Sequence, residues 1–239
     1  MGRFVRTLTI TYDLDIGFWE MPLFRGAVIR AMGAMADVLF HNHTDSDRLR
    51  YAYPLIQYKR IGNKASIVAI DQGADVVGQF ASCGCNMLQI GQREVSCNVL
   101  RIQPCRVLVQ LWESLLHYRL CRWMPLNDKN YAIYCKLETP IERKNMLESI
   151  LRGNLLAMLK GMGVWLDGNL VVKINYLSEP FLLQYKGVRL MAFNVDFESN
   201  LSIPTNLGVG RHVSVGFGTI KQCRENQTGA RVDEEKNEL

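Results

Sequence analysis

Two of the four histidines, His41 and His43, stand one residue apart in the stretch LFHNHTDSDRLRYAYPLIQYKR, which covers positions 39 to 60. If this stretch is extended, both side chains project to the same face, because side chains of a strand alternate. An imidazole titrates near neutral pH and suits both acid and base roles. Such a pair can act on one RNA phosphodiester without a metal ion. A base takes the 2′-hydroxyl proton, the oxygen attacks phosphorus, and an acid protonates the departing 5′ oxygen.

Two other interpretations of the histidine pair stay open. A zinc or manganese site would need further ligands, and the carboxylates nearby in the sequence are Asp37, Asp45 and Asp47. Alternatively, the stretch is an exposed polar turn after a helix. No metal site is predicted elsewhere, because the seven cysteines lack the paired spacing of a zinc knuckle.

A basic and aromatic tract follows the histidines, and it is typical of segments that contact phosphates and stack on unpaired bases. Its members are Arg48, Arg50, Tyr51, Tyr53, Tyr58, Lys59 and Arg60. The alternative is an ordinary strand with half-buried tyrosines and solvated cations.

A glycine-rich stretch near the C-terminus reads NLGVGRHVSVGFGTIK and contains Gly208, Gly210, Gly216 and Gly218. Val213 stands where a dinucleotide-binding fingerprint needs glycine, and no phosphate-loop Gly-Lys-Ser/Thr is present. Backbone N–H groups of such loops bind phosphate, here beside Arg211 and His212. The alternative is a mobile hairpin crossing, which the spacing alone does not exclude.

Composition fits a folded protein with one basic surface. The 239 residues carry a formal charge of +5, and residues 1 to 223 carry +7 because positions 224 to 239 hold three basic and five acidic side chains. A moderate excess of this kind favours a polyanionic partner such as nucleic acid. With neither a signal peptide nor a long apolar run, we expect a cytoplasmic protein without a membrane partner.

The pattern along the chain predicts an α+β protein with two similar units. In the first, a strand at 4–10, a helix at 22–40, two strands joined at Gly62-Asn63, a helix at 72–80 and a strand at 95–102 give the order βαββαβ, a ferredoxin-like unit. We place the units at 1–103 and 104–222, with Pro104 at the boundary, and expect residues 223–239 to form a disordered charged tail.

The second unit contains the clearest helix signal. Thr139 as N-cap, Pro140 at the first helical position and Glu142 three residues after the cap form a capping box. Strands are expected at 170–176, 188–198 and 216–221. Trp112, Trp123 and Trp165 are interpreted as core residues, and His117 as structural.

Together these motifs resemble the CRISPR-associated endoribonucleases of the repeat-associated mysterious protein (RAMP) superfamily, which cut precursor CRISPR RNA within each repeat. LGVGRHVSVGFGTI is similar to the glycine-rich loop of this superfamily, and FRGAVIRAM, LFHNH and YAYPLIQYKRIGNKASIVAID are similar to one branch of it. The resemblance implies two tandem ferredoxin-like, RRM-like domains, cleavage without a metal or other cofactor, and a 2′,3′-cyclic phosphate product.

The resemblance also implies roles for particular residues. His41 and His43 are the candidate base and acid, and Tyr51 or Tyr53 orients the scissile nucleotide. We expect Arg25, Lys59 and Arg60 to stabilise the transition-state charge. Arg211, His212, Lys221 and the four loop glycines are expected to hold the RNA.

Two rival functions are distinguishable from processing. A RAMP-superfamily subunit that holds guide RNA in an effector complex would bind RNA and leave it intact, and a metal-dependent phosphohydrolase would stop working in a chelator. The expected partner is CRISPR repeat RNA. The sequence leaves open whether two copies form a homodimer and whether the chain joins effector-complex subunits.

Overall fold

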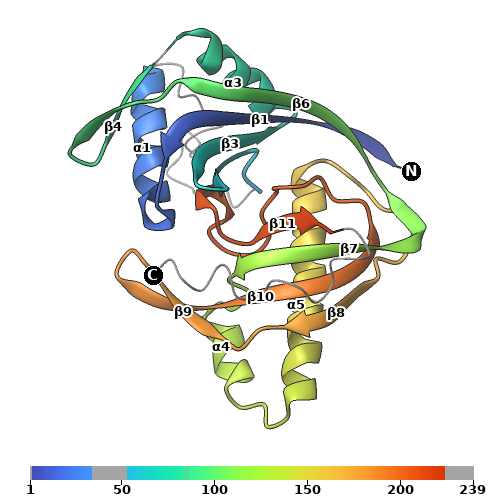
Figure 1. The fold of residues 1–239 in the computed structure, drawn as a ribbon. Helices are drawn as coiled ribbons and strands as arrows, with labels where there is room; N and C mark the ends of the chain where they lie inside the picture. The colour runs from blue at the N-terminus through green and yellow to red at the C-terminus, as the bar shows by residue number, and fades with distance from the viewer. Residues whose placement is uncertain (1, 34–52, 85, 224–239) are drawn as a thin grey trace, which may run out of the picture.

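The computed structural model describes residues 2–33, 53–84 and 86–223. It contains two α+β units that follow one another along the chain (Figure 1). No helix among these residues is both long enough and apolar enough to cross a membrane.

The first unit is a four-stranded antiparallel sheet covered by helices on one face. Its sheet has the strand order β2-β3-β1-β6. The elements are β1 (Arg3–Asp15), η1 (Phe18–Glu20), α1 (Met21–Met32), β2 (Ile56–Ile61), β3 (Lys64–Ile70), α3 (Gln72–Ser82) and β6 (Val99–Val109). This order and connectivity are those of the ferredoxin-like fold, so the predicted βαββαβ unit is confirmed.

A small hairpin is inserted before the last strand of the first unit. It consists of β4 (Met87–Ile90) and β5 (Arg93–Ser96), which pair with each other outside the main sheet. This hairpin is not among the elements that the sequence pattern predicts. The hairpin packs on α1, where Leu88 and Ile90 join the same buried cluster as Phe24 and Val28.

The second unit repeats the strand order of the first but lacks its second helix. Its elements are β7 (Leu111–Trp123), α4 (Asp128–Tyr134), α5 (Pro140–Gly161), β8 (Val172–Leu177), β9 (Phe181–Tyr185), β10 (Val188–Leu201), η3 (Val213–Val215) and β11 (Thr219–Gln222). The sheet order is β11-β7-β10-β8, with β9 paired to β10. Between β10 and β11, residues 202–218 contain only the short 3-10 turn η3. The glycine-rich segment therefore occupies the place of a crossover helix.

The chain passes from one sheet to the other between β6 and β7. Pro104 lies within β6, opposite Leu8 of β1. A proline is tolerated there because β6 is an edge strand and one side of it has no partner strand to receive an N–H. The change of sheet therefore comes at Gln110, after the position that we used as the boundary.

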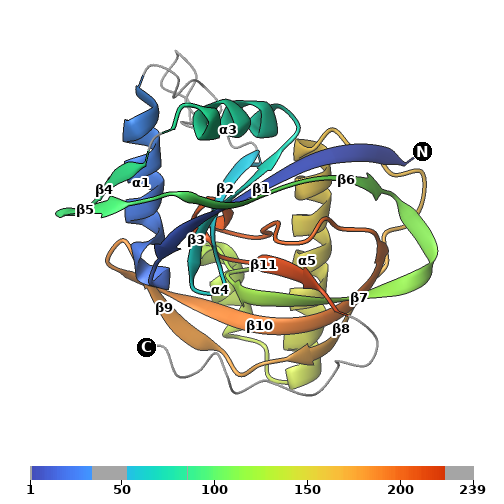
Figure 2. The ribbon, with the colours of Figure 1, turned by 45° about the horizontal axis from the view of Figure 1, so that its top comes forward.

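The two faces of the first sheet have different partners. Ile10, Tyr58 and Ile67 pack with α1 and α3 in one buried cluster. Val5 and Val68, which point to the opposite face, belong to a second cluster that includes Leu151 of α5. The first sheet is thus covered on both faces, and the second unit, which lies below the first in Figures 1 and 2, supplies one of the covers.

Helix α5 begins as the sequence predicts. Thr139 Oγ1 accepts a hydrogen bond from the Glu142 backbone N–H at 3.3 Å, and Glu142 Oε2 accepts one from the Thr139 N–H at 3.0 Å. This capping box satisfies two N–H groups that have no partner within the helix. The buried stripe of α5 consists of Leu147, Leu151, Leu155, Met158 and Leu159.

The tryptophans differ in part from expectation. Trp123 is fully buried, but Trp112 is 45% exposed and Trp165 is 71% exposed, so the interpretation of these two as core residues was wrong. Trp112 lies near the start of β7, and Trp165 lies on the segment after α5. Neither position is covered by a second layer, which residue type alone does not reveal.

Replacing the cap of α5 should destabilise the fold. We expect Thr139→Ala to lower the free energy of unfolding by about 1 kcal/mol, because the N-terminal N–H groups lose their acceptor. Urea unfolding followed by circular dichroism measures this. Thr139→Ser keeps the acceptor and should match the parent protein; equal stabilities of the Ala and Ser variants would contradict the assignment.

Candidate functional site

The segment that carries the family resemblance, Tyr53 to Lys59, separates its side chains onto two faces. Ile56 and Tyr58 pack into the cluster under α1 and α3. Tyr53, Gln57 and Lys59 point the opposite way, toward the second unit, because side chains of an extended chain alternate. The polar side chains of this segment thus face the glycine-rich segment.

Tyr53 and Gln57 bond the two backbone groups of Gly208. The Tyr53 hydroxyl donates to the Gly208 carbonyl at 2.8 Å, and the Gly208 N–H donates to Gln57 Oε1 at 2.9 Å. Gln57 is fully buried, and its Nε2 donates to the Pro54 carbonyl at 3.1 Å. A Cβ at position 208 would lie 2.7 Å from Lys59 Nζ, so only glycine fits without displacement.

Lys59 connects β2 to the C-terminal part of the glycine-rich segment. Its Nζ donates to the Val213 carbonyl at 3.2 Å and to Thr219 Oγ1 at 3.2 Å, and Thr219 Oγ1 donates to the Gly216 carbonyl at 3.0 Å. The side chain is 1% exposed. Burial lowers the pKa of the Lys59 amine to about 7, because the charged form loses its hydration. We call Tyr53, Gln57 and Lys59, with their bonds to this segment, the β2 clamp.

The glycine-rich segment itself has a conformation that needs glycine at two points. Gly218 has φ +59°, and a Cβ there would lie 1.9 Å from the Val209 carbonyl oxygen. Gly210 has φ +91°, and a Cβ there would lie 2.8 Å from the Trp123 ring. The glycines therefore permit tight packing between β7 and the first sheet.

An aromatic and basic cluster lies at the outer side of this segment. The rings of His212 and Tyr185 are 4.4 Å apart, those of Tyr185 and Phe217 are 5.6 Å apart, and those of Phe217 and Phe18 are 5.0 Å apart. The Arg122 guanidinium lies 4.0 Å from the centre of the Phe18 ring. These rings come from η1, the β9–β10 hairpin and the glycine-rich segment, so the cluster joins the two units.

His212 is a neutral imidazole at physiological pH. Burial, together with the charges of Arg211 and Lys186, lowers its pKa to about 4. It therefore offers ring stacking and hydrogen bonding to a ligand, while the positive charge of this surface comes from Lys186 and from guanidinium groups. Burial raises the pKa of Tyr185, an effect that the Arg25 guanidinium reduces.

The structure places the remaining predicted cations at different distances from this cluster. Arg25 is half-buried on α1 beside Tyr185. Arg60 Nε donates to the Ile16 carbonyl at 2.9 Å, and Arg211 Nη1 donates to the Leu126 carbonyl at 2.9 Å. Lys221 is exposed on β11 opposite Arg119. Arg211 thus lies on the glycine-rich segment and Arg25 beside the aromatic cluster, whereas Arg60 bonds the turn before η1 and Lys221 lies on β11.

Five predicted residues lie outside the described part of the chain, and their roles stay predictions. They are His41, His43, Arg48, Arg50 and Tyr51. The described chain resumes at Tyr53, whose hydroxyl bonds Gly208. Residue 53 is therefore the point at which the histidine-containing segment joins the β2 clamp.

Several residues of this region were not selected from the sequence. Gln57 and Thr219 complete the hydrogen bonds of the clamp, and Tyr185 carries the ring against His212. A signal for Gln57 was present, because polar side chains at 57 and 59 alternate with Ile56 and Tyr58 in a strand pattern. No local signal marks Tyr185, since its partner is distant in the chain.

The arrangement suits RNA chemically. Backbone groups and glycine contacts give a rigid support, and the outer surface offers aromatic rings together with Arg25, Lys186 and Arg211. Unpaired bases stack on aromatic rings, and phosphates bind guanidinium and ammonium groups.

Comparison with known proteins matches both units. Residues 3–105 match the family model for the Cas6b N-terminal domain, and residues 110–223 match the model for the Cas6b C-terminal domain. A curated relative, Uncharacterized protein MJ0978 of Methanocaldococcus jannaschii, is 37% identical over 115 residues, which are 47% of this chain and 76% of the relative.

Solved structures agree with these matches. "Crystal structure of Cas6b" has a TM-score of 0.83 at 28% identity and covers 92% of this chain and 100% of its own. "Crystal structure of CRISPR RNA processing endoribonuclease Cas6b" has a TM-score of 0.71 at 25% identity, with 92% and 100% covered. "Csf5, CRISPR-Cas type IV Cas6 crRNA endonuclease", at 12% identity, TM-score 0.56 and coverage of 93% and 100%, shares the fold.

Removing the Tyr53 hydroxyl should weaken the junction of the two units. We expect Tyr53→Phe to lower the free energy of unfolding by about 1–3 kcal/mol, because the buried Gly208 carbonyl loses its donor. Chemical denaturation measures the change. Tyr176→Phe, which removes a hydroxyl from a tyrosine that is 39% exposed, is the matched control and should have little effect. If both variants unfold alike, the hydrogen bond to Gly208 adds nothing.

The buried amine of Lys59 should make stability depend on pH. Its pKa is about 7 in the folded protein against 10.5 ordinarily, so between these values the unfolded chain holds a proton that the folded chain has released. The free energy of unfolding therefore gains up to about 1.4 kcal/mol per pH unit from this group as pH rises.

Lys59→Met lacks this titration. We expect the stability difference between the parent and Lys59→Met to shift in favour of the parent as pH rises from about 7 to about 10. Urea unfolding at a series of pH values tests it, with the exposed Lys173→Met as control. Parallel pH profiles for parent and Lys59→Met would show that Lys59 titrates normally.

Proposed function

Because the chain belongs to the Cas6b family, we propose that it is an endoribonuclease that cuts precursor CRISPR RNA within its repeats to produce guide RNAs. The support comes from the match over both units and from the β2 clamp, which holds the glycine-rich segment beside aromatic and cationic side chains. The rest of the proposal concerns the chemistry.

The proposed reaction needs no metal ion, because RNA supplies its own nucleophile. A base removes the proton of the 2′-hydroxyl, and the oxygen attacks the adjacent phosphorus. The bond from phosphorus to the 5′ oxygen breaks, and an acid donates a proton to that oxygen. The products are a 2′,3′-cyclic phosphate and a free 5′-hydroxyl.

His41 and His43 are the proposed base and acid, on the basis of their adjacency in the sequence and the family resemblance. His212 is a poor candidate for the acid, because its lowered pKa leaves it unprotonated at neutral pH. The hydroxyl of Tyr53 is bonded to Gly208, so we assign Tyr53 to positioning the glycine-rich segment and leave Tyr51 to orient the scissile nucleotide.

RNA binding is proposed for the outer surface of the glycine-rich segment. Arg25, Lys186 and Arg211 would contact phosphates, and the Tyr185 and His212 rings would contact a base. Lys59 is buried, so its proposed contribution is to hold the segment in place, and Lys221 would reach only RNA that extends over β11.

Cleavage of a host repeat RNA in excess EDTA tests the proposal. We expect a single cut that disappears when the nucleotide at the cut is 2′-deoxy, and a loss of roughly 10²- to 10⁴-fold in rate for His41→Ala or His43→Ala. His117→Gln is the matched control, since His117 pairs with Glu198 on the sheet of the second unit and should leave the rate unchanged.

Two results would contradict the proposal. RNA that is bound but stays intact would make the chain a guide-RNA-binding subunit of an effector complex. Activity that EDTA abolishes would require a metal-dependent mechanism.

A further inference from the structure

A groove outside the proposed site lies along α5. It is formed by the helix and the segment 162–170, and its lining includes Arg152, Leu156, Lys160, Trp165, Leu166 and Leu170. Trp165 is 71% exposed and Leu156 is 47% exposed, which are high values for large apolar side chains. Nothing in the family resemblance or in the proposed reaction accounts for this surface.

The charged side chains that line the groove, Arg152 and Lys160, are both cations, and the carboxylate of the segment 162–170, Asp167, does not line it. Arg152, Leu156 and Lys160 stand at successive four-residue spacings, so they form one row on the exposed side of α5, with the two cations about 12 Å apart along the axis. Both cations are exposed, and neither forms an ion pair within the described part of the chain. No carboxylate of a described residue lines the groove. The charge of the lining therefore favours an anionic ligand.

One end of the groove adjoins the β2 clamp. Gly161 follows Lys160, and it packs so closely on Tyr53 that an added Cβ would lie 2.2 Å from the Tyr53 Cβ. Tyr53 in turn bonds Gly208. Tyr53 therefore contacts both the glycine-rich segment and the end of α5 that carries Lys160.

We propose that this groove binds an unpaired stretch of the substrate RNA, with a base stacked on Trp165 and phosphates at Lys160 and Arg152. Single-stranded nucleic acid binds where cations follow the backbone and aromatic rings stack on the bases, and the aliphatic floor supplies further apolar contact. The proposal rests on the proposed function for the identity of its ligand. An exposed indole in a groove whose charged lining side chains are both cations favours RNA over a protein partner.

The affinity for an uncleavable RNA tests the groove. The probe is a fluorescein-labelled host repeat RNA with 2′-deoxy at the cut, and its anisotropy gives the dissociation constant. We expect Trp165→Ala to weaken binding by about 5- to 150-fold, the range for loss of one stacked base. Trp165→Phe keeps an aromatic face and should retain most of the affinity.

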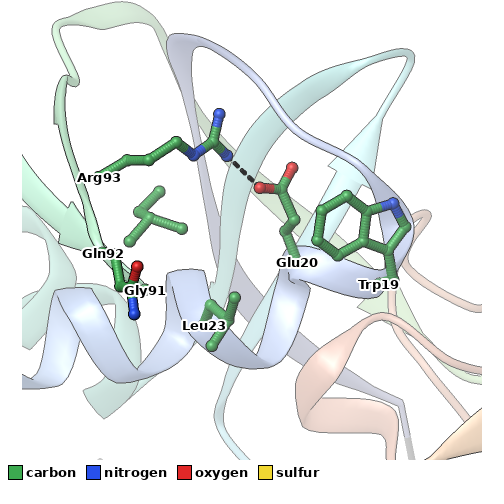
Figure 3. A pocket seen from close by; sticks show the side chains of 7 residues that line it. Trp19, Glu20, Leu23, Gly91, Gln92 and Arg93 are labelled. Atoms are coloured by element: carbon green, nitrogen blue, oxygen red, sulfur yellow. Dashed lines mark hydrogen bonds and ion pairs between the residues drawn. The ribbon is translucent and has the colours of Figure 1, made fainter.

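A second exposed tryptophan gives a matched control. Trp19 is 75% exposed and lies beside Glu20, which is paired with Arg93, as Figure 3 shows. Its pocket contains a carboxylate, so Trp19→Ala should leave RNA affinity unchanged. A loss equal to that of Trp165→Ala would indicate a nonspecific effect and would contradict the proposal.

The cations have their own readout. Replacing both Arg152 and Lys160 by glutamine should reduce the slope of log affinity against log salt by about 1.4, because each phosphate contact contributes about 0.7 on single strands. An unchanged slope would remove these residues from the phosphate contacts.

A fluorescence measurement keeps the test valid if Trp165→Ala folds poorly. With Trp19 and Trp112 replaced by phenylalanine, Trp165 is the exposed tryptophan of the described residues and Trp123 is fully buried. We expect the uncleavable RNA to quench the emission. No quenching, or unchanged affinity in Trp165→Ala, would overturn the proposal and leave the groove to a protein partner.

The groove and the proposed reaction fail separately. If RNA binding depends on Trp165 but the protein does not cut RNA, the proposed reaction is wrong and the proposed binding in the groove stands. If the protein cuts RNA normally but its RNA affinity does not depend on Trp165, only the proposed binding in the groove is wrong.

Discussion

The junction between β2 and the glycine-rich segment is the interaction on which the arrangement of this protein depends. Gln57 and Lys59 of β2, and Tyr53 just before it, bond backbone or hydroxyl groups of residues 208, 213 and 219. Gln57 and Lys59 are buried, Tyr53 and Thr219 are half-buried, and a buried polar group without a partner is costly. The two units are therefore held in one register, since a shift of either would leave several such groups unsatisfied.

The same junction explains the irregular form of the second unit. A helix between β10 and β11 would present side chains toward β2, but the space beside Lys59 and Val209 accepts only hydrogen at positions 208 and 218. An open segment with glycines brings the backbone itself against the first sheet. Its other side carries the His212 ring, which lies against Tyr185 of β9, and the buried Phe217 ring packs beneath Tyr185 where both units meet. The segment is thus held rigidly on the side that faces the first sheet, and its other side presents aromatic and basic groups. A binding site needs such a rigid support.

The proposed site and the groove along α5 are linked through Tyr53, which bonds Gly208 and packs on Gly161. Their chemical characters differ, because the first combines aromatic rings with several cations and the second has one exposed indole in an aliphatic setting. A substrate that used both would be contacted over a longer stretch than the cleaved bond alone requires. A longer contact raises affinity because more phosphates are bound. The stacked bases give a preference for unpaired RNA.

Local pattern determined much of this protein: the strand and helix order of the first unit, the capping box at Thr139, and the glycine requirement near the C-terminus follow from period, caps and turn chemistry, which act over a few residues. Strand alternation also indicated that Gln57 and Lys59 share a face. Tertiary structure decided that this face packs on the glycine-rich segment, where Lys59 is buried and hydrogen-bonded. It also placed Tyr185 beside His212. It also left Trp165 and Trp112 exposed, because burial depends on which elements pack together across the chain.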